Sequence, residues 1–197
     1  MKFIIGLLVG FCLVPLGAYL YFASGQAPVA TTDSNMPFEE FLAEKALDAR
    51  LAKDTPKIVP IQPNEANYVA GAELYKEHCA VCHGLPLAPK TAIATGMYPE
   101  PPHLLEGKGV TDDEPGESYW KIFNGIRLTG MPGFSKSLSE TQMWQIALLV
   151  KNADKLPSSA KMALVAPSGG GAANATPPQV SPVAPPPAFP SSSAPPK

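Results

Sequence analysis

Cysteine and histidine are scarce in this chain, which has three of each among 197 residues. A structural zinc site needs four ligands, usually supplied as two pairs. Cys79 and Cys82 form one pair, but Cys12 lies in an apolar segment, and neither His78 nor His103 has the spacing of a second pair. The sequence is therefore a poor match to a zinc protein.

Positive charge is also in short supply. Fifteen Lys and Arg stand against 17 Asp and Glu, so the formal net charge is −2, and the basic residues form no cluster. Proteins that bind nucleic acids carry basic patches that attract phosphates. We therefore expect no nucleic-acid partner, and the mixed charges between residues 64 and 156 select no partner by a single charged patch.

The alternating pattern of β-strands is missing around Cys79, which disfavours a thioredoxin-like dithiol, because that motif normally lies in a βαβ context. What the chain does contain is Cys79-Ala80-Val81-Cys82-His83, the C-x-x-C-H signature of c-type haem attachment. Two thiols on one helical turn can each bond to a vinyl group of the same porphyrin, while the next imidazole points at the iron. The motif predicts one covalent haem c, with zinc or dithiol chemistry as the alternatives.

Phe3 to Ala23 is a continuous, mostly apolar run without a charge. At ~1.5 Å per residue, a helix of this length can cross a bilayer core. Lys2 precedes the run and acidic residues follow it, so the positive-inside tendency places the N-terminus in the cytoplasm. Residues 1–25 are predicted to be a single transmembrane anchor in a bacterial inner membrane, with the rest in the periplasm. The alternative is a signal sequence cleaved near Ala23, which would release a soluble periplasmic protein.

Residues 26–63 are predicted to be a linker that contains one charged helix, at about 37–53. This helix has a modest apolar stripe, formed by Phe38, Phe41, Leu42 and Ala49. This helix either packs on the following domain or stands as a solvated spacer. From residue 157 to 197 the chain is dominated by Pro, Ala, Ser and Gly, which cannot bury enough apolar surface to offset ordering entropy, so we expect a disordered tail.

Helix signals define a folded unit at residues 64–156. In its first helix, Gly71 suggests close approach of another helix, because glycine is otherwise costly there. The unit is small, and a buried haem would add apolar core. The expected helix starts are Asn64 before 65–77, Thr111 with Glu114 before a helix to about 124, and Ser139 with Gln142 before a helix to about 153.

An iron whose second axial position is filled by a protein ligand is closed and passes electrons, whereas an iron without that ligand is open and binds gases or peroxide. Four side chains downstream are candidates. Met143 lies in a helix stripe, where methionine usually fills core. Met131 lies in a loop between Gly130 and Pro132, directly before the final helix. Met97, in another Gly/Pro-rich loop, and His103 stay as alternatives.

The order of these features resembles the class I c-type cytochromes of the bacterial monohaem kind. It comprises a helix with Gly-x-x-x-Tyr, C-x-x-C-H, a proline-rich loop, a helix, Thr-Gly-Met-Pro and a final helix with an aromatic residue. The resemblance implies a small all-α fold around one haem, with Cys79 and Cys82 as thioether attachments, His83 as proximal ligand and Met131 as distal ligand. It also implies that the first and last helices cross at Gly71, Tyr75 and Trp144.

Two further side chains are placed near this haem. Arg127 precedes the Met131 loop and either pairs with a propionate or is exposed. His103 either reaches the haem edge or lies on the surface. The function that fits is electron transfer with redox partners at the membrane, without catalysis by the chain itself. The alternatives are a cytochrome subunit of a membrane dehydrogenase or oxidase and, less favoured, a peroxidase or gas sensor.

Overall fold

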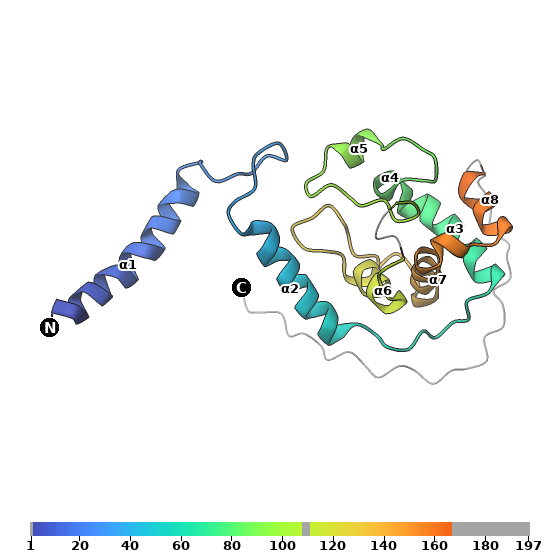
Figure 1. The fold of residues 1–197 in the computed structure, drawn as a ribbon, viewed down its shortest axis with the longest axis horizontal. Helices are drawn as coiled ribbons and strands as arrows, with labels where there is room; N and C mark the ends of the chain where they lie inside the picture. Colours follow the sequence, from blue (N-terminus) through green and yellow to red (C-terminus); the bar gives the residue numbers. More distant parts are fainter. Residues whose placement is uncertain (1, 108–110, 167–197) are drawn as a thin grey trace.

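Every regular element is a helix within the residues that the computed structural model describes, which are 2–107 and 111–166, with the side chains of residues 2, 5 and 8 left out. The all-α prediction is confirmed for this part of the chain. Figure 1 shows the elements in order: α1 Lys2–Ala23, α2 Glu39–Asp54, α3 Glu65–His78, α4 Ala80–His83, α5 Ala92–Thr95, α6 Pro115–Asn124, α7 Glu140–Lys151, a 3-10 turn Ala153–Lys155 and α8 Ser158–Val165.

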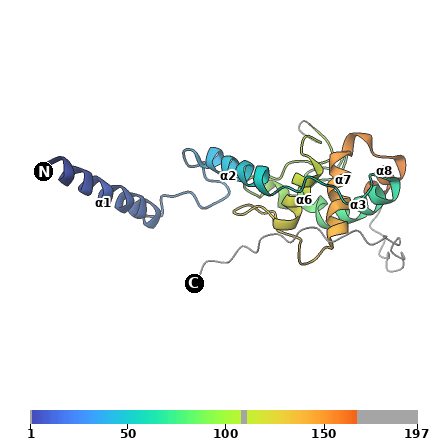
Figure 2. The ribbon, with the colours of Figure 1, turned by 90° about the horizontal axis from the view of Figure 1, so that it is seen from below.

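Helix α1 projects away from the other helices in both ribbon views (Figures 1 and 2). Its described large apolar side chains are exposed, among them Phe3, Phe11 and Phe22. Among the described residues, no helix combines the length and the apolar run that a membrane crossing needs. The structure therefore gives no support to the transmembrane anchor expected within residues 1–25.

The core is built on the crossing of α3 and α7. Asn64 caps α3 by accepting a hydrogen bond from the Asn67 amide at 2.9 Å. At Gly71 a Cβ would lie 2.4 Å from the backbone oxygen of Gln145 in α7, so only glycine lets the two helices approach this closely. The predicted close approach at Gly71 is confirmed.

Helix α7 has the capping box predicted from Ser139 and Gln142. The Gln142 amide donates to the Ser139 hydroxyl at 3.3 Å, and the Gln142 side chain accepts from the Ser139 amide at 2.9 Å. Trp144 of α7 stacks on Tyr119 of α6 with ring centroids 4.2 Å apart, which joins the two helices. The apolar run of α7 is buried, as its pattern predicts.

Helix α6 begins later than its sequence signals suggested. The predicted start used Thr111 and Glu114 as a capping box, but Thr111 has φ +76° and Glu114 makes no side-chain cap. The first helical residue is Pro115, whose fixed φ suits the first turn and whose missing N–H costs nothing there. The capping-box prediction was wrong, whereas the predicted end at about residue 124 is confirmed, since α6 ends at Asn124 and Gly125 follows with φ +70°.

Helix α8 corrects the prediction that the disordered tail starts at residue 157. Ala160 and Leu164 are 0% and 2% exposed, and α8 packs against α3. The Lys76 ammonium of α3 donates to the carbonyl oxygens of Ala163 at 2.7 Å and Ala166 at 3.3 Å, at the end of α8 where cations are favoured. The folded unit therefore extends beyond residue 156, and residues 167–197 lie outside the described residues.

Candidate functional site

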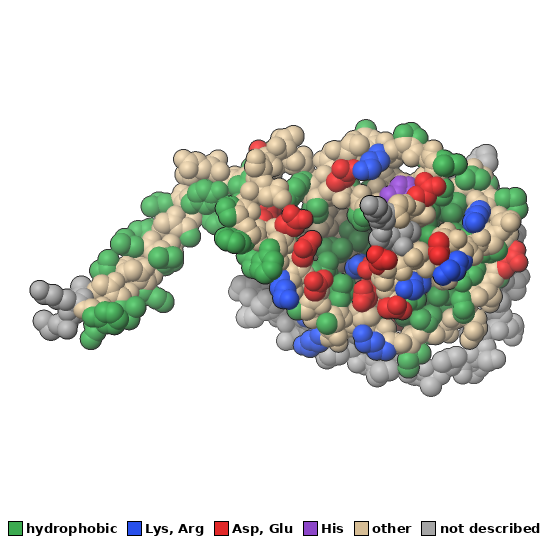
Figure 3. All heavy atoms as spheres, in the orientation of Figure 1, with side chains coloured by type: hydrophobic (Ala, Val, Ile, Leu, Met, Phe, Trp, Pro, Cys, Tyr) green, Lys and Arg blue, Asp and Glu red, His purple; other side chains and the backbone are tan. Residues whose placement is uncertain are grey.

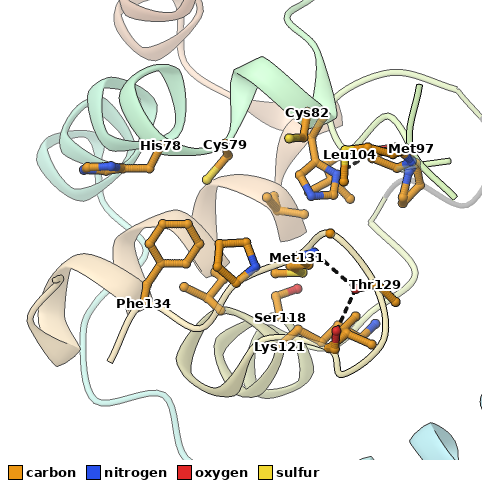
Figure 4. A pocket seen from close by; sticks show the side chains of 18 of the residues that line it. His78, Cys79, Cys82, Met97, Leu104, Ser118, Lys121, Thr129, Met131 and Phe134 are labelled. Carbon is orange, nitrogen blue, oxygen red and sulfur yellow. Dashed lines mark hydrogen bonds between the residues drawn. The ribbon is translucent and has the colours of Figure 1, made fainter. Parts of the chain in front are cut away.

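One cavity of about 250 Å³ opens between α3, α4, α6, α7 and two loops (Figure 4). Most of its lining is apolar, and Figure 3 shows a hollow with hydrophobic atoms in the face that is viewed. The polar side chains that reach it come mainly from α6 and the two loops. Its apolar lining includes Met97, Leu104, Ile122, Met131, Phe134 and Ile146.

Cys79 and Cys82 lie at the upper wall of this cavity in Figure 4, and His83 also lines the cavity. Helix α3 ends at His78, and Cys79 starts the single turn of α4, where the amides of Cys82 and His83 donate to the Cys79 carbonyl oxygen at 3.1 and 2.9 Å. This turn brings both thiols and the imidazole to the same cavity. The predicted grouping of Cys79, Cys82 and His83 is what the structure shows.

The Cys79 thiol does not have the character of a reactive thiol. Burial, and secondly the charge of Cys82, raises the pKa of the Cys79 thiol to about 12, so it is protonated at neutral pH. A redox dithiol instead needs a lowered thiol pKa. In the described part of the chain, no three His, Cys, Asp or Glu side chains gather as a metal-ion site. Neither alternative to haem attachment gains support from this geometry.

His83 is oriented by the loop on the other side of the turn. Its Nδ1 lies 2.8 Å from the Pro102 carbonyl oxygen, which can only accept, so Nδ1 carries the hydrogen and Nε2 keeps its lone pair. Burial lowers the pKa of His83, although the hydrogen bond to Pro102 acts in the opposite direction. The imidazole is therefore neutral and set in the tautomer that binds a metal through Nε2.

The chain around His83 is fixed by two further contacts. The buried Tyr75 hydroxyl donates to the carbonyl oxygens of Gly84 at 3.0 Å and His83 at 3.3 Å, and burial raises the pKa of Tyr75 far above its ordinary value. The His103 ring packs against Gly84, where a Cβ would lie 2.8 Å away. His103 Nδ1 accepts from the Glu106 amide at 3.1 Å, so Nε2 donates to the Leu85 carbonyl oxygen at 3.3 Å. His103 thus joins two loops and does not line the cavity.

Met131 lies on the wall opposite the cysteines (Figure 4). Its loop is closed on itself: the Met131 amide donates to Thr129 Oγ1 at 3.1 Å, and that hydroxyl donates to the Ile126 carbonyl oxygen at 2.7 Å. A Cβ on Gly133 would lie 2.7 Å from the Asn124 carbonyl oxygen, so the two ends of the loop are in contact. This geometry presents the Met131 thioether to the cavity.

Met97 reaches the same cavity from the proline-rich loop. Its methyl carbon would lie 1.9 Å from a Cβ on Gly130, so glycine at 130 leaves the space that Met97 occupies. Met143, in contrast, is fully buried in α7 and does not line the cavity. The structure therefore brings two thioethers to the cavity and excludes two of the four candidates, Met143 and His103, from its lining.

Arg127 is exposed and does not line the cavity, so its pairing with a haem propionate stays a prediction. The cation that does line the cavity is Lys121 of α6, which forms an ion pair with Asp113. Sequence reasoning missed Lys121, because nothing local distinguishes it from an exposed helix lysine; in the structure it lines the cavity together with Ser118 and Ile122.

The donor set fits a haem c. Two thiols, of which the buried Cys79 thiol is protonated, and a neutral imidazole with a free Nε2 share one wall, a thioether lies on the opposite wall, and the surface between them is largely apolar. These are the groups that a covalently attached, two-ligand haem takes from a protein.

A match to a protein family leads in the same direction. Residues 66–150 match the family model described as cytochrome C oxidase, cbb3-type, subunit III, which supports a c-type cytochrome domain with haem and an electron-transfer role. No curated protein matches the chain. Among solved structures, a chain of the Kuenenia stuttgartiensis reducing HAO-like protein complex Kustc0457/Kustc0458 is 26% identical, with a TM-score of 0.42. The match spans half of each chain.

Proposed function

We propose that this chain is an electron-transfer protein that holds one haem c, bound covalently through Cys79 and Cys82, with His83 and Met131 as the axial ligands. The observation that carries the proposal is the placement of the C-x-x-C-H turn and the Met131 thioether on opposite walls of one apolar cavity. A haem bound there supplies a one-electron iron couple, and a thioether ligand favours its ferrous form.

The chain's own residues suit electron transfer because they keep the two ligands in place. The Pro102 carbonyl oxygen orients His83 through a 2.8 Å contact, and Tyr75 holds the turn that follows it. Thr129 does the same for the Met131 loop. With the ligand positions set before the electron arrives, little of the protein has to move when the charge changes, which favours a carrier over an enzyme.

The first candidate role is a carrier that docks transiently on redox proteins at a membrane, with its haem domain in the periplasm. This placement rests on the sequence: Phe3 to Ala23 carries no charge, Lys2 precedes it and the next charged residue is acidic. Residues 1–25 act either as an anchor or as a cleaved signal sequence. Fractionation of cells that express the full chain tests both forms, and recovery of the haem protein in the cytoplasm would contradict them.

The second candidate role is an electron-transfer subunit of a larger membrane oxidase or dehydrogenase. It is favoured by the description of the matching family, which is that of an oxidase subunit. A carrier is expected to migrate alone after mild detergent extraction and native electrophoresis. A subunit is expected to migrate in a stable larger complex that stains for haem.

The ligand assignment is tested by absorption spectra of the reduced full-length protein before and after carbon monoxide is added. A denaturing gel stained for haem reports covalent attachment in the same sample. We expect a haem-stained band and an unchanged low-spin spectrum, because both axial positions are taken. Rapid formation of a carbon monoxide adduct would contradict the closed site and would favour gas binding or peroxide chemistry.

A further inference from the structure

Residues 35–56, called the strap here, lie outside the family-matched segment 66–150 yet reach the cavity. The strap contains α2, which lies beside α6 in both ribbon views (Figures 1 and 2). Leu47, near the middle of α2, is half-buried and is one of the residues that line the cavity. The cavity wall is thus completed by a part of the chain that the c-type domain match does not include.

The C-terminal end of the strap is fixed on the start of α6. Leu51 and Thr55 are each 7% exposed. A Cβ on Gly116 would lie 2.1 Å from the Pro56 carbonyl oxygen and 2.9 Å from the Thr55 methyl group. Glycine at 116 therefore allows the strap backbone to lie directly on α6.

The N-terminal end of the strap is fixed on the proline-rich loop. The side chains of Asn35 and Tyr98 share a hydrogen bond, and Glu39 and Glu40 lie near enough to Tyr98 to act on its charge. Tyr98 lies between Met97 and Pro99, which both line the cavity. The strap therefore bridges the two segments that border this side of the cavity, the proline-rich loop and α6.

The docked face of α2 is narrow. Leu47 and Leu51 are four residues apart and turn toward the domain, whereas Phe38, Phe41 and Leu42 are 75%, 61% and 62% exposed. The larger apolar residues of this segment thus do not hold it in place. Its attachment depends on the contacts of Leu47, Leu51 and Thr55, together with the bond at Asn35.

We propose that the strap is the outer wall of the cofactor site and that Leu47 limits access of small molecules to it. The inference rests on the proposed function, since it takes the cavity to hold a haem. An apolar leucine at this place shields the site from water, and a charged side chain there would be driven out of the cavity, because burying an unpaired charge is costly. Undocking of the strap would then leave the haem attached but more open.

The test compares Leu47→Asp with Leu42→Asp in full-length holoprotein. The two changes are identical and lie on the same helix, but Leu42 is exposed and does not line the cavity. Both are made in a Met131→Ala background, which removes the proposed distal ligand so that access alone limits the reaction. We expect Leu47→Asp to raise the carbon monoxide association rate by about tenfold, equivalent to about 1.4 kcal/mol, and Leu42→Asp to leave it unchanged.

A second readout follows the strap itself. Trypsin cleaves after Arg50 and Lys53, both inside the strap, so faster cleavage there reports undocking whether or not haem is bound. We expect faster cleavage in Leu47→Asp, and also in Gly116→Ala, which places a Cβ against the Pro56 carbonyl oxygen. Equal carbon monoxide rates in the Leu47 and Leu42 variants would overturn the strap as a wall and leave the proposed function intact. Absence of covalently bound haem in the full-length protein without these substitutions would overturn the proposed function instead.

Discussion

The two walls of the cavity that carry the proposed axial ligands are held in different ways. The His83 wall is tied to distant parts of the chain: Tyr75 donates to Gly84, and Pro102 accepts from His83. The Met131 wall is held mainly by bonds inside its own loop, through Thr129 and Ile126. Non-local contacts constrain a segment from several sides, so the His83 wall should resist change and the Met131 wall should yield first.

The largest effect is expected from removing the covalent attachment on the more constrained wall. In the double variant Cys79→Ser with Cys82→Ser, neither side chain can form a thioether, so haem should be lost from the denatured protein completely. Haem staining of a denaturing gel, with Cys12→Ser as the control, measures this. A haem-stained band in the double variant would show that the attachment lies elsewhere.

On the Met131 wall, Met131→Ala should remove the distal ligand of the iron while the haem stays attached. Carbon monoxide should then form an adduct with the reduced protein, and haem staining should not change. Met143→Leu serves as the control, because Met143 is buried in α7 away from the cavity and the change conserves its volume. If Met131→Ala keeps a closed low-spin spectrum, the distal ligand is another side chain, and Met97 is the first to examine.

A smaller effect is expected from loosening the constrained wall without removing a ligand. Tyr75→Phe deletes the hydroxyl that donates to the Gly84 and His83 carbonyl oxygens, and it leaves the buried Gly84 carbonyl without that donor. The free energy of unfolding should fall by about 1–3 kcal/mol, measured by urea denaturation of the holoprotein. Tyr68→Phe, on the same helix and outside this turn, should cost less. Equal losses would show that the Tyr75 bonds add no special constraint.

Helix starts and one helix crossing could be predicted because their signals are local. Asn64, Ser139 with Gln142, and Gly71 each act through neighbours in sequence or through the plain lack of a side chain. The C-x-x-C-H turn and the Met131 loop are also local motifs, and the structure brings both to one cavity. What the sequence could not supply is how segments far apart in the chain meet.

Two differences show that limit. Helix α8 was not predicted because its residues belong to a Pro- and Ala-rich segment. In the structure it is held by Lys76 on α3, more than 80 residues away in the sequence. Along the segment that contains α2, the expected stripe of Phe38, Phe41, Leu42 and Ala49 is exposed, and Leu47 and Leu51 make the contacts instead. Each outcome depends on which surface the partner element offers, and that information is not local.

Met97 offers a finer test of the Met131 wall. Its methyl group fills the space beside Gly130, so it supports the loop from outside. Met97→Ala should leave a gap there and raise the rate of carbon monoxide binding a few-fold, whereas Met97→Leu, which conserves volume, should stay near wild type. An effect as large in Met97→Leu as in Met97→Ala would mean that the Met97 sulfur matters, and not its packing.

The smallest effect concerns the cation at the cavity. Lys121 lines it beside Asp113, and Arg127 is exposed outside it. A positive charge near the haem stabilises the reduced, more electron-rich state, so Lys121→Gln should lower the reduction potential measured by redox titration. Arg127→Gln, the matched loss of one charge, should lower it less, because solvent screens an exposed cation. A larger decrease in reduction potential for Arg127→Gln than for Lys121→Gln would favour the propionate contact of Arg127, with its side chain turned inward when haem is bound.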